Sequence, residues 1–366
     1  MVTRRTMLMM GLAAPLLGAC GGGNGAKAAQ GERVVSTDLP ADDWSTATPD
    51  SQGVPASAMQ TLMTEGAAIS ALHSMLVVRN GQLIGEQYFG QARSSDLRHI
   101  RSSTKTVCSL LIGQALRDGK ISSTASTLAE LLPRELAAVP TSVAGAITLQ
   151  QVLQMRGGQS WDEEAHISQL WETPDLTRFA LGLPNTGGHP WNYNSAAAHL
   201  LSPILADAYG MDTLALATRN LFAPLGIRQV AWDRDSRGDY YGSFGLQLRT
   251  RDLMKLGVMA LAGGAWQGQQ VVPASWIVES QRSFASLGDA GSLLQIGYGN
   301  LWWTGVLSGY PVVLAWGAGG QYALLVPSLN MVFATSADWN LPLSQDGDNE
   351  IVILNLIGRF LSALAR

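Results

Sequence analysis

The chain has 366 residues, of which 46% are apolar and 14% are charged, and its formal net charge is −4 at neutral pH. This composition is typical of a compact globular protein with a sizeable core, and it excludes a disordered chain. The acidic balance gives no electrostatic basis for binding nucleic acid.

The first 20 residues have the pattern of an export signal. A twin-arginine pair precedes an apolar run over residues 8–17, which is too short to span a bilayer as a helix. The run leads into Leu-Gly-Ala-Cys, which resembles the lipobox of bacterial lipoproteins. We therefore expect residues 1–20 to be a lipoprotein signal peptide and Cys20 to carry a lipid that anchors the protein to a membrane of the exported bacterial cell envelope. An ordinary cleaved signal with a chance cysteine is the alternative.

The segment that follows is expected to lead into a folded domain near residue 55. Residues 21–54 are rich in Gly, Ala, Ser and Asp without periodicity, which predicts a flexible tether. Helical spacing appears over residues 57–69. Asn-Gly at residues 80–81, between two apolar runs, is a strong hairpin signal. A buried helix is predicted over residues 103–119, closed by a glycine.

The rest of the chain divides into a helical middle and a strand-rich end. Short helical patterns broken by Pro and Gly fill residues 121–235, and further helices are predicted over 251–262 and 273–281. Strands and a final helix are predicted at 301–307, 310–315, 321–326, 331–336 and 349–365. We therefore predict an α+β fold in which an antiparallel sheet is built from both chain ends and flanked by helices (55–120 and 236–366), with an inserted helical lobe (121–235).

Ser102 and Lys105 are the central candidates for chemistry. A serine hydroxyl needs a base within hydrogen-bond reach, and residues three apart on a helix share a face. The N-terminus of the predicted helix would also favour an anion at Ser102. A capping serine with an exposed lysine is the alternative, but the motif runs directly into an apolar stretch, which places Lys105 beside the core.

Two later segments have residue types that suit the same chemistry. Trp-Asn-Tyr-Asn-Ser at residues 191–195 follows a loop rich in Gly and Pro, and the Tyr193 hydroxyl could relay protons beside a lysine. Ala-Trp-Gly-Ala-Gly-Gly at residues 315–320 lies between two predicted strands, where glycines permit a ligand to approach backbone N–H groups, as an oxyanion hole requires. An aromatic wedge and a plain turn are the respective alternatives.

Together and in this order, the three motifs resemble those of the serine β-lactamase and penicillin-binding-protein superfamily, whose signature includes Ser-x-x-Lys. The likeness covers about residues 55–366 and is nearest to the class C β-lactamase-related hydrolases, which include esterases and nylon-oligomer hydrolases. The resemblance implies that Ser102 is the acylated nucleophile, Lys105 its base and Tyr193 the tyrosine of the family's Tyr-x-Asn motif. Ser195 stands at the third position of that motif, as in the nylon-oligomer branch.

The strand motif departs from the family pattern, because Ala315-Trp316-Gly317 replaces Lys-Thr-Gly. In this register the Ala318 N–H joins the Ser102 N–H in the oxyanion hole, and a slip would give that role to Gly319 or Gly320. The expected substrate-binding residues are Ser195, Trp191, Trp316, Gly317, Gly319 and Gly320. Because the lysine that helps to hold a substrate carboxylate is missing, we expect neutral or hydrophobic esters or amides rather than antibiotics to be the substrates.

The resulting prediction is a serine hydrolase that forms an acyl-enzyme on small ester or amide substrates, with D-amino-acid and oligomeric amides among the candidates, and needs no cofactor or metal. A penicillin-binding DD-peptidase or β-lactamase activity, or a non-catalytic binding protein of the same fold, is the alternative. An α/β-hydrolase is disfavoured because Gly-x-Ser-x-Gly is absent from the sequence. A zinc site around residues 162–166 is disfavoured because the histidines have no ligand spacing, and this segment is predicted to be an exposed acidic loop.

Overall fold

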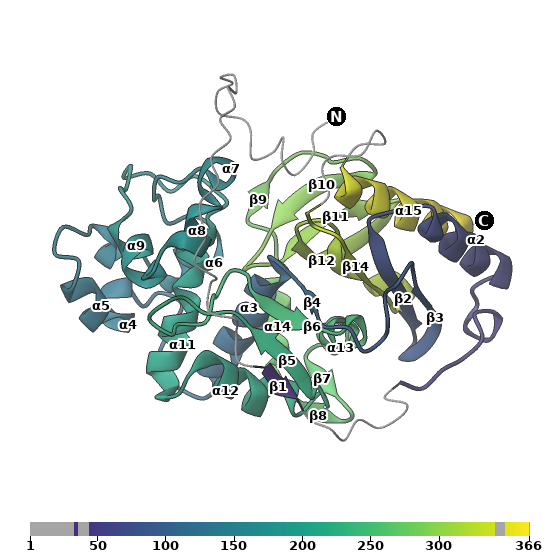
Figure 1. Cartoon of the computed structure of the whole chain (residues 1–366), viewed down its shortest axis with the longest axis horizontal. Coiled ribbons are helices and arrows are strands. Elements are labelled where there is room, and N and C mark those ends of the chain that lie inside the picture. Colours follow the sequence, from purple (N-terminus) through teal and green to yellow (C-terminus); the bar gives the residue numbers. More distant parts are fainter. Residues whose placement is uncertain (1–32, 36–43, 341–347, 366) are drawn as a thin grey trace.

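The computed structural model describes residues 33–35, 44–340 and 348–365. The expected signal peptide, Cys20 and most of the expected tether therefore lie outside the described residues. Figure 1 places a helical lobe on the left and a large sheet on the right, with α3 (Ser103–Arg117) between them. Among the described residues, no helix has the length and apolar character needed to cross a membrane.

The large sheet has eight antiparallel strands in the order β3-β2-β14-β13-β12-β11-β10-β9. Their bounds are β2 Leu72–Arg79, β3 Gln82–Tyr88, β9 Ala285–Ser286, β10 Leu293–Tyr298, β11 Trp303–Leu307, β12 Tyr310–Gly317, β13 Gln321–Val326 and β14 Met331–Ala337. Since β14 pairs with β2, with Phe333 opposite Val77, the sheet joins the two ends of the domain. The predicted α+β fold, with a sheet built from both chain ends, is confirmed.

The predicted hairpin turn lies between β2 and β3. Asn80 and Gly81 have φ values of 52° and 75°, which is the left-handed pair that a two-residue turn with the right twist requires. Asn tolerates this region better than most residues, and Gly adopts it without steric cost.

Helices cover both faces of the sheet because its strands present apolar side chains in both directions. On β14, Phe333 packs edge-on against Phe360 of α15 (Asn349–Leu364), with ring centroids 5.7 Å apart. The adjacent Val332 points to the other face, where it lies close to Gly257 of α13 (Thr250–Leu261). Helix α2 (Ala56–Ala67) packs beside α15.

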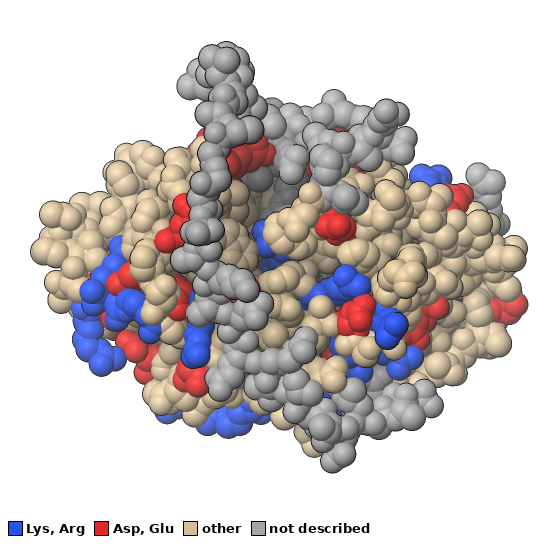
Figure 2. Space-filling view, in the orientation of Figure 1, with Lys and Arg blue, Asp and Glu red and all other residues tan. Residues whose placement is uncertain are grey.

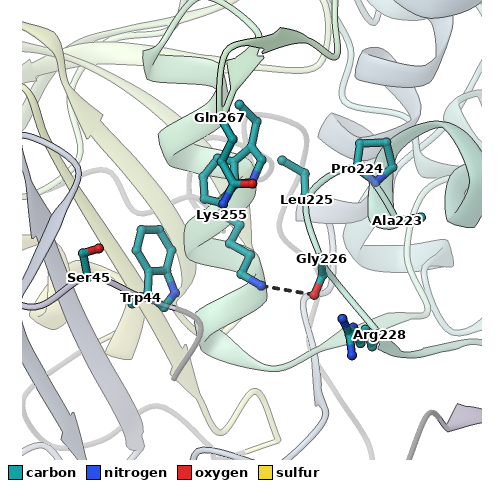
Figure 3. A pocket seen from close by; sticks show the side chains of 10 residues that line it. Trp44, Ser45, Ala223, Pro224, Leu225, Gly226, Arg228, Lys255 and Gln267 are labelled. Carbon is teal, nitrogen blue, oxygen red and sulfur yellow. Dashed lines mark hydrogen bonds between the residues drawn. The ribbon is translucent and has the colours of Figure 1, made fainter. Parts of the chain in front are cut away.

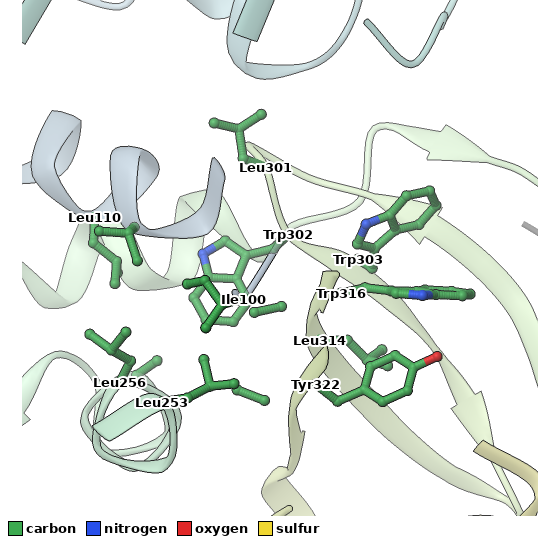
Figure 4. Close-up of a cluster of buried hydrophobic side chains, with 14 of the residues drawn as sticks. Ile100, Leu110, Leu253, Leu256, Leu301, Trp302, Trp303, Leu314, Trp316 and Tyr322 are labelled. Carbon is green, nitrogen blue, oxygen red and sulfur yellow. The ribbon is translucent and has the colours of Figure 1, made fainter. Parts of the chain in front are cut away.

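A buried cluster fills the space between the nucleophile helix and the sheet. Figure 4 shows Leu110 of α3 and Leu253 of α13 on one side of Ile100 and Trp302. On the other side, Trp303, Trp316 and Tyr322 from β11 to β13 lie one above another. This packing fixes the start of α3 relative to the end of β12, which matters for the site described below.

Short helices make up the inserted lobe. They are α4 Leu128–Leu131, α5 Pro133–Ala137, η2 Ala144–Ala146, α6 Leu149–Leu153, α7 Glu163–His166, α8 Gln169–Glu172, α9 Leu176–Gly182, α10 Ser195–His199, α11 Leu201–Tyr209, α12 Thr213–Ala217 and η3 Thr218–Phe222. The helical stretch that follows Asn194 is divided into α10 and α11. The reason is Pro203, whose missing N–H cannot bond the His199 carbonyl.

The expected bounds of the helical lobe and of the flexible tether differ from the structure in three ways. A smaller sheet has the order β1-β5-β6-β4, with bounds β1 Arg33–Val35, β4 Arg98–His99, β5 Gln229–Trp232 and β6 Leu246–Leu248. Strand β5 thus belongs to a sheet rather than to the helical lobe, and β1 lies inside the expected tether. The end of that tether also packs on the fold, because Trp44 and Val54 are buried and the Ala47 N–H donates to the Leu83 carbonyl at 3.1 Å.

The remaining described elements lie around this frame. They are η1 Asp50–Gln52, β7 Ala265–Trp266, β8 Gln269–Gln270, α14 Ala274–Ser280 and η4 Pro327–Leu329. On the face seen in Figure 2, acidic and basic side chains are interspersed among uncharged residues, in keeping with the low charged fraction of the sequence.

Candidate active site

Ser102 stands at the N-terminus of α3, with its side chain partly exposed among buried neighbours. Lys105, one turn along the helix, is only 1% exposed, and its Nζ lies 3.2 Å from Ser102 Oγ. The capping alternative is wrong, since Ser102 makes no side-chain cap and the lysine is buried. The structure therefore brings together a reachable hydroxyl and a buried amine.

The Lys105 amine has two further hydrogen-bond acceptors. Its Nζ lies 2.9 Å from Ser195 Oγ and 2.9 Å from the carbonyl oxygen of Ser243. Together with Ser102 Oγ, these oxygens surround the Lys105 nitrogen with three polar neighbours. The amine is thus fixed in orientation as well as in position.

Tyr193 also lies against the amine, through the face of its ring. The Lys105 Nζ is 4.8 Å from the ring centroid, a distance at which a cation is attracted to the aromatic face. Tyr193 is buried and belongs to a chain of aromatic contacts that runs through Trp191, Tyr298, Trp303 and Trp316. The loop motif and the strand motif predicted from the sequence therefore meet beside the Ser102–Lys105 pair.

Trp316 and Ser195 were expected to contact the substrate, but in the structure both side chains make hydrogen bonds within the protein. Trp316 is 1% exposed and its Nε1 donates to Glu350 at 2.6 Å, so it supports the site from within the core, whereas Trp191 is half-buried. The Ser195 hydroxyl accepts from Lys105 and donates to Glu163. It is thus part of the hydrogen-bond network of the lysine.

Glu163 corrects the prediction of an exposed acidic loop over residues 162–166. Asp162 and Glu164 are exposed, but Glu163 is 8% exposed and faces inward. Its Oε2 accepts from the Ser195 N–H at 3.0 Å and from Trp161 Nε1 at 2.6 Å. Sequence reasoning missed this residue because 32 positions separate it from Ser195.

The glycine-rich turn between β12 and β13 lies against the backbone that leads to the nucleophile. A Cβ on Gly317 would lie 2.1 Å from the Ile100 carbonyl oxygen, so only glycine permits this approach. The Ser103 hydroxyl also donates to the Gln321 carbonyl at 3.1 Å. The turn is therefore held next to residues 100–103, as an oxyanion hole requires.

Hydrogen bonds within the turn favour Ala318 over the two alternative donors. The Gly319 N–H donates to Glu350 Oε1 at 2.7 Å, and the Gly320 N–H donates to the Gly317 carbonyl at 3.2 Å. The Ala318 N–H makes no hydrogen bond within the described part of the chain. A one- or two-residue slip of the register would require breaking one of these two bonds.

Arg101 was not singled out from the sequence, although it directly precedes the nucleophile. Its φ of 53° lies in the left-handed region, which costs energy for a residue with a Cβ. Its guanidinium stands 3.9 Å from the ring centroid of Trp339 and 5.4 Å from that of Trp171. The turn into α3 is thus clamped between an aromatic ring of the helical lobe and one that follows β14.

The loop that supplies the Ser243 carbonyl is held by two buried side chains. The Gly242 N–H donates to His199 Nδ1 at 3.3 Å, and Cys108 Sγ donates to the Gly242 carbonyl at 3.2 Å. Burial raises the pKa of the Cys108 thiol to about 12, as is typical of a structural rather than a reactive cysteine.

His199 also has two aspartates nearby, so the histidines are less scattered than the sequence suggested. Ligand atoms of His199, Asp235 and Asp239 lie within 4.8 Å of one another. Because Nδ1 of His199 accepts, its Nε2 carries the proton and lies 3.2 Å from Thr177 Oγ1, which in turn donates to Asp239 at 3.0 Å. Protein hydrogen bonds thus account for both ring nitrogens.

This buried histidine predicts a loss of stability on mild acidification. Burial lowers the pKa of His199 to about 3, so the ring is neutral in the fold and becomes protonated below about pH 6.5 only in the unfolded chain. Between pH 7 and pH 5, before most carboxylates titrate, its contribution to the free energy of unfolding should fall by about 2 kcal/mol. Urea unfolding at several pH values measures this, and the fall should be smaller by that amount in His199→Gln. An equal pH dependence in both proteins would contradict the assignment.

A separate pocket of about 480 Å³ lies away from these residues. Figure 3 shows Lys255 donating to the Gly226 carbonyl, with Trp44 on one side and Arg228 on the other. None of the residues around Ser102 lines it.

Comparisons with known proteins agree with this geometry. The Beta-lactamase family model matches residues 56–356. The chain is 26% identical to 6-aminohexanoate-dimer hydrolase of Paenarthrobacter ureafaciens over 293 residues, which are 74% of this chain and 73% of that protein. Among solved structures it resembles a candidate 6-aminohexanoate-dimer hydrolase from Bacillus anthracis (TM-score 0.68, 19% identity, 83% of each chain). It also resembles an octameric penicillin-binding protein homologue from Pyrococcus abyssi (TM-score 0.65, 17% identity, 84% of this chain and 78% of that one).

The family model covers most of the chain and contains Ser102, Lys105, Tyr193 and the glycine-rich turn in the order predicted from the sequence. The chain therefore belongs to the beta-lactamase family and is a serine hydrolase.

Proposed function

We propose that the chain hydrolyses an ester or amide bond through an acyl-enzyme on Ser102. The observation that carries this proposal is the 3.2 Å separation of Lys105 Nζ and Ser102 Oγ at the start of α3. A buried amine at this distance can take the hydroxyl proton as the oxygen attacks a carbonyl carbon.

In the proposed cycle, Ser102 Oγ bonds to the carbonyl carbon and its proton passes to Lys105. The carbonyl oxygen becomes an oxyanion and accepts hydrogen bonds from the N–H groups of Ser102 and Ala318. The tetrahedral intermediate then expels the alcohol or amine, which takes the proton from Lys105. Water attacks the acyl-enzyme in the same way, transfers its proton through Lys105, and releases the acid and Ser102. The ring of Tyr193 contributes by holding the lysine against its face.

The proposed substrates are small neutral or hydrophobic esters and amides. The aromatic side chains beside the site, with Trp191 half-buried, support this preference, as does the absence of lysine from the strand motif at residues 315–317. The name of the 6-aminohexanoate-dimer hydrolase adds linear amide oligomers to the substrates to be tested.

A fluorophosphonate label combined with a substrate panel tests the proposal. The wild type should be labelled on Ser102 and should cleave short acyl esters or linear amides faster than penicillins, whereas Ser102→Ala should be neither labelled nor active. Failure to label Ser102 would contradict an acyl-enzyme and favour a binding protein. Fast penicillin turnover with weak ester cleavage would contradict the substrate preference.

We also propose that Cys20 is lipidated after cleavage of residues 1–20 and holds the hydrolase on a membrane of the bacterial cell envelope. The support is the signal-like sequence alone, because these residues lie outside those described. Fractionation of cells that express the wild type or Cys20→Ala should find the wild type with membranes and the variant released from them. An equal distribution of the two proteins would refute the anchor.

A further inference from the structure

Glu163 lies behind the Ser102–Lys105 pair, where its carboxylate accepts three hydrogen bonds. Oε1 accepts from the Ser195 hydroxyl, and Oε2 accepts from the Ser195 N–H at 3.0 Å and from Trp161 Nε1 at 2.6 Å. The residue is 8% exposed, so water offers it little compensation. An ionised carboxylate can only accept, and it therefore satisfies all three donors at once.

The direction of these bonds determines how Lys105 faces the nucleophile. Because Ser195 uses its hydroxyl proton on Glu163, its oxygen is left to accept from Lys105 Nζ at 2.9 Å. The Ser243 carbonyl accepts a second N–H at 2.9 Å. A neutral amine has two N–H groups and one lone pair. With both N–H groups occupied, the lone pair points at Ser102 Oγ, 3.2 Å away.

We propose that Glu163 is a positioning residue which, through the Ser195 hydroxyl, keeps the lone pair of Lys105 directed at Ser102. Glu163 does not touch the reacting atoms, because Ser195 and Lys105 stand between it and the nucleophile. The inference rests on the proposed function, in which neutral Lys105 removes the Ser102 proton.

The Glu163→Gln variant tests which groups donate and which accept in this hydrogen-bond network, because glutamine has almost the same shape as glutamate. Its NH₂ group cannot replace Oε2, which faces two donors, so it must replace Oε1 and donate to Ser195 Oγ. The Ser195 proton then turns toward Lys105 and occupies the lone pair. We expect kcat and the rate of fluorophosphonate labelling of Ser102 to fall on the order of 100-fold, with KM and Tm nearly unchanged.

Two further variants separate this role from a structural one. Glu164→Gln makes the same chemical change at the adjacent exposed position and should label at the wild-type rate. Ser195→Ala removes the hydroxyl that transmits the effect, so it should label slowly by itself. In that background Glu163→Gln should add less than a threefold effect, since interacting residues are not additive.

The outcomes distinguish the inference from the function on which it rests. If the wild type is not labelled, the proposed function fails and the inference has no basis. If the wild type is labelled and Glu163→Gln or Ser195→Ala labels equally fast, only the inference is overturned. Multiplicative effects of the two substitutions would also overturn it, because they would place Glu163 outside the Ser195 path.

Discussion

The Lys105→Met variant is expected to fold and to lose nearly all hydrolytic activity, with kcat lowered by about 10²–10⁴-fold. Methionine has a similar length and no proton acceptor, so the Ser102 hydroxyl loses the base that lies 3.2 Å away. KM should change little, because the amine contacts Ser102, Ser195, Ser243 and the Tyr193 ring, which all belong to the protein.

The fold should tolerate this substitution better than the chemistry does. Methionine keeps most of the volume of the lysine side chain, so the main cost is the donor lost by the Ser243 carbonyl, about 1–3 kcal/mol in the free energy of unfolding. Lys255 is a matched control, because it is also buried and pairs with Asp252 at 3.4 Å in α13. Lys255→Met should keep the kcat of the folded protein. Steady-state kinetics and thermal melting measure both effects, and a Lys105→Met variant with more than a tenth of wild-type kcat would exclude Lys105 as the base.

Much of the fold could be predicted because its elements have periodic apolar patterns. The expected strands at 310–315, 321–326 and 331–336 correspond to β12, β13 and β14, and the final helix to α15. Strand β10 was missed where the pattern is irregular. Its register shifts between Leu294 and Gly297, and Gln295 has a φ of 51°, so polar and apolar residues do not alternate.

How well the site could be predicted depended on how far apart its interacting residues lie in the sequence. Ser102 and Lys105 lie within one helical turn, so their contact follows from helix geometry alone. Glu163 contacts Ser195, 32 positions away, and Glu350 contacts Gly319, 31 positions away. The sequence by itself does not distinguish a buried glutamate from an exposed one. Only the tertiary arrangement indicates which acidic residue faces inward.

The Gly317→Ala variant is expected to lower kcat by about 10²–10³-fold by displacing the proposed oxyanion hole. Its new Cβ would lie 2.1 Å from the Ile100 carbonyl oxygen and 2.9 Å from the Gln321 Cβ. The Ile100 carbonyl is a backbone group and cannot rotate out of the way as the end of a flexible side chain can. Strand β12 must therefore move away from the turn that leads into α3. The Ala318 N–H moves with it, and its distance from the Ser102 N–H increases.

This effect can be distinguished from a general loss of stability. The φ of Gly317 is not in the left-handed region, so the damage comes from the close contact rather than from backbone strain. We expect a cost of about 1–3 kcal/mol in the free energy of unfolding, typical of overpacking. Gly182→Ala is the control, since its nearest new contact would be Val139 Cγ1 at an ordinary 3.6 Å. Assayed well below its Tm, Gly317→Ala should still bind substrate but label slowly with fluorophosphonate. Wild-type labelling would mean that the oxyanion donors lie elsewhere than at the end of β12.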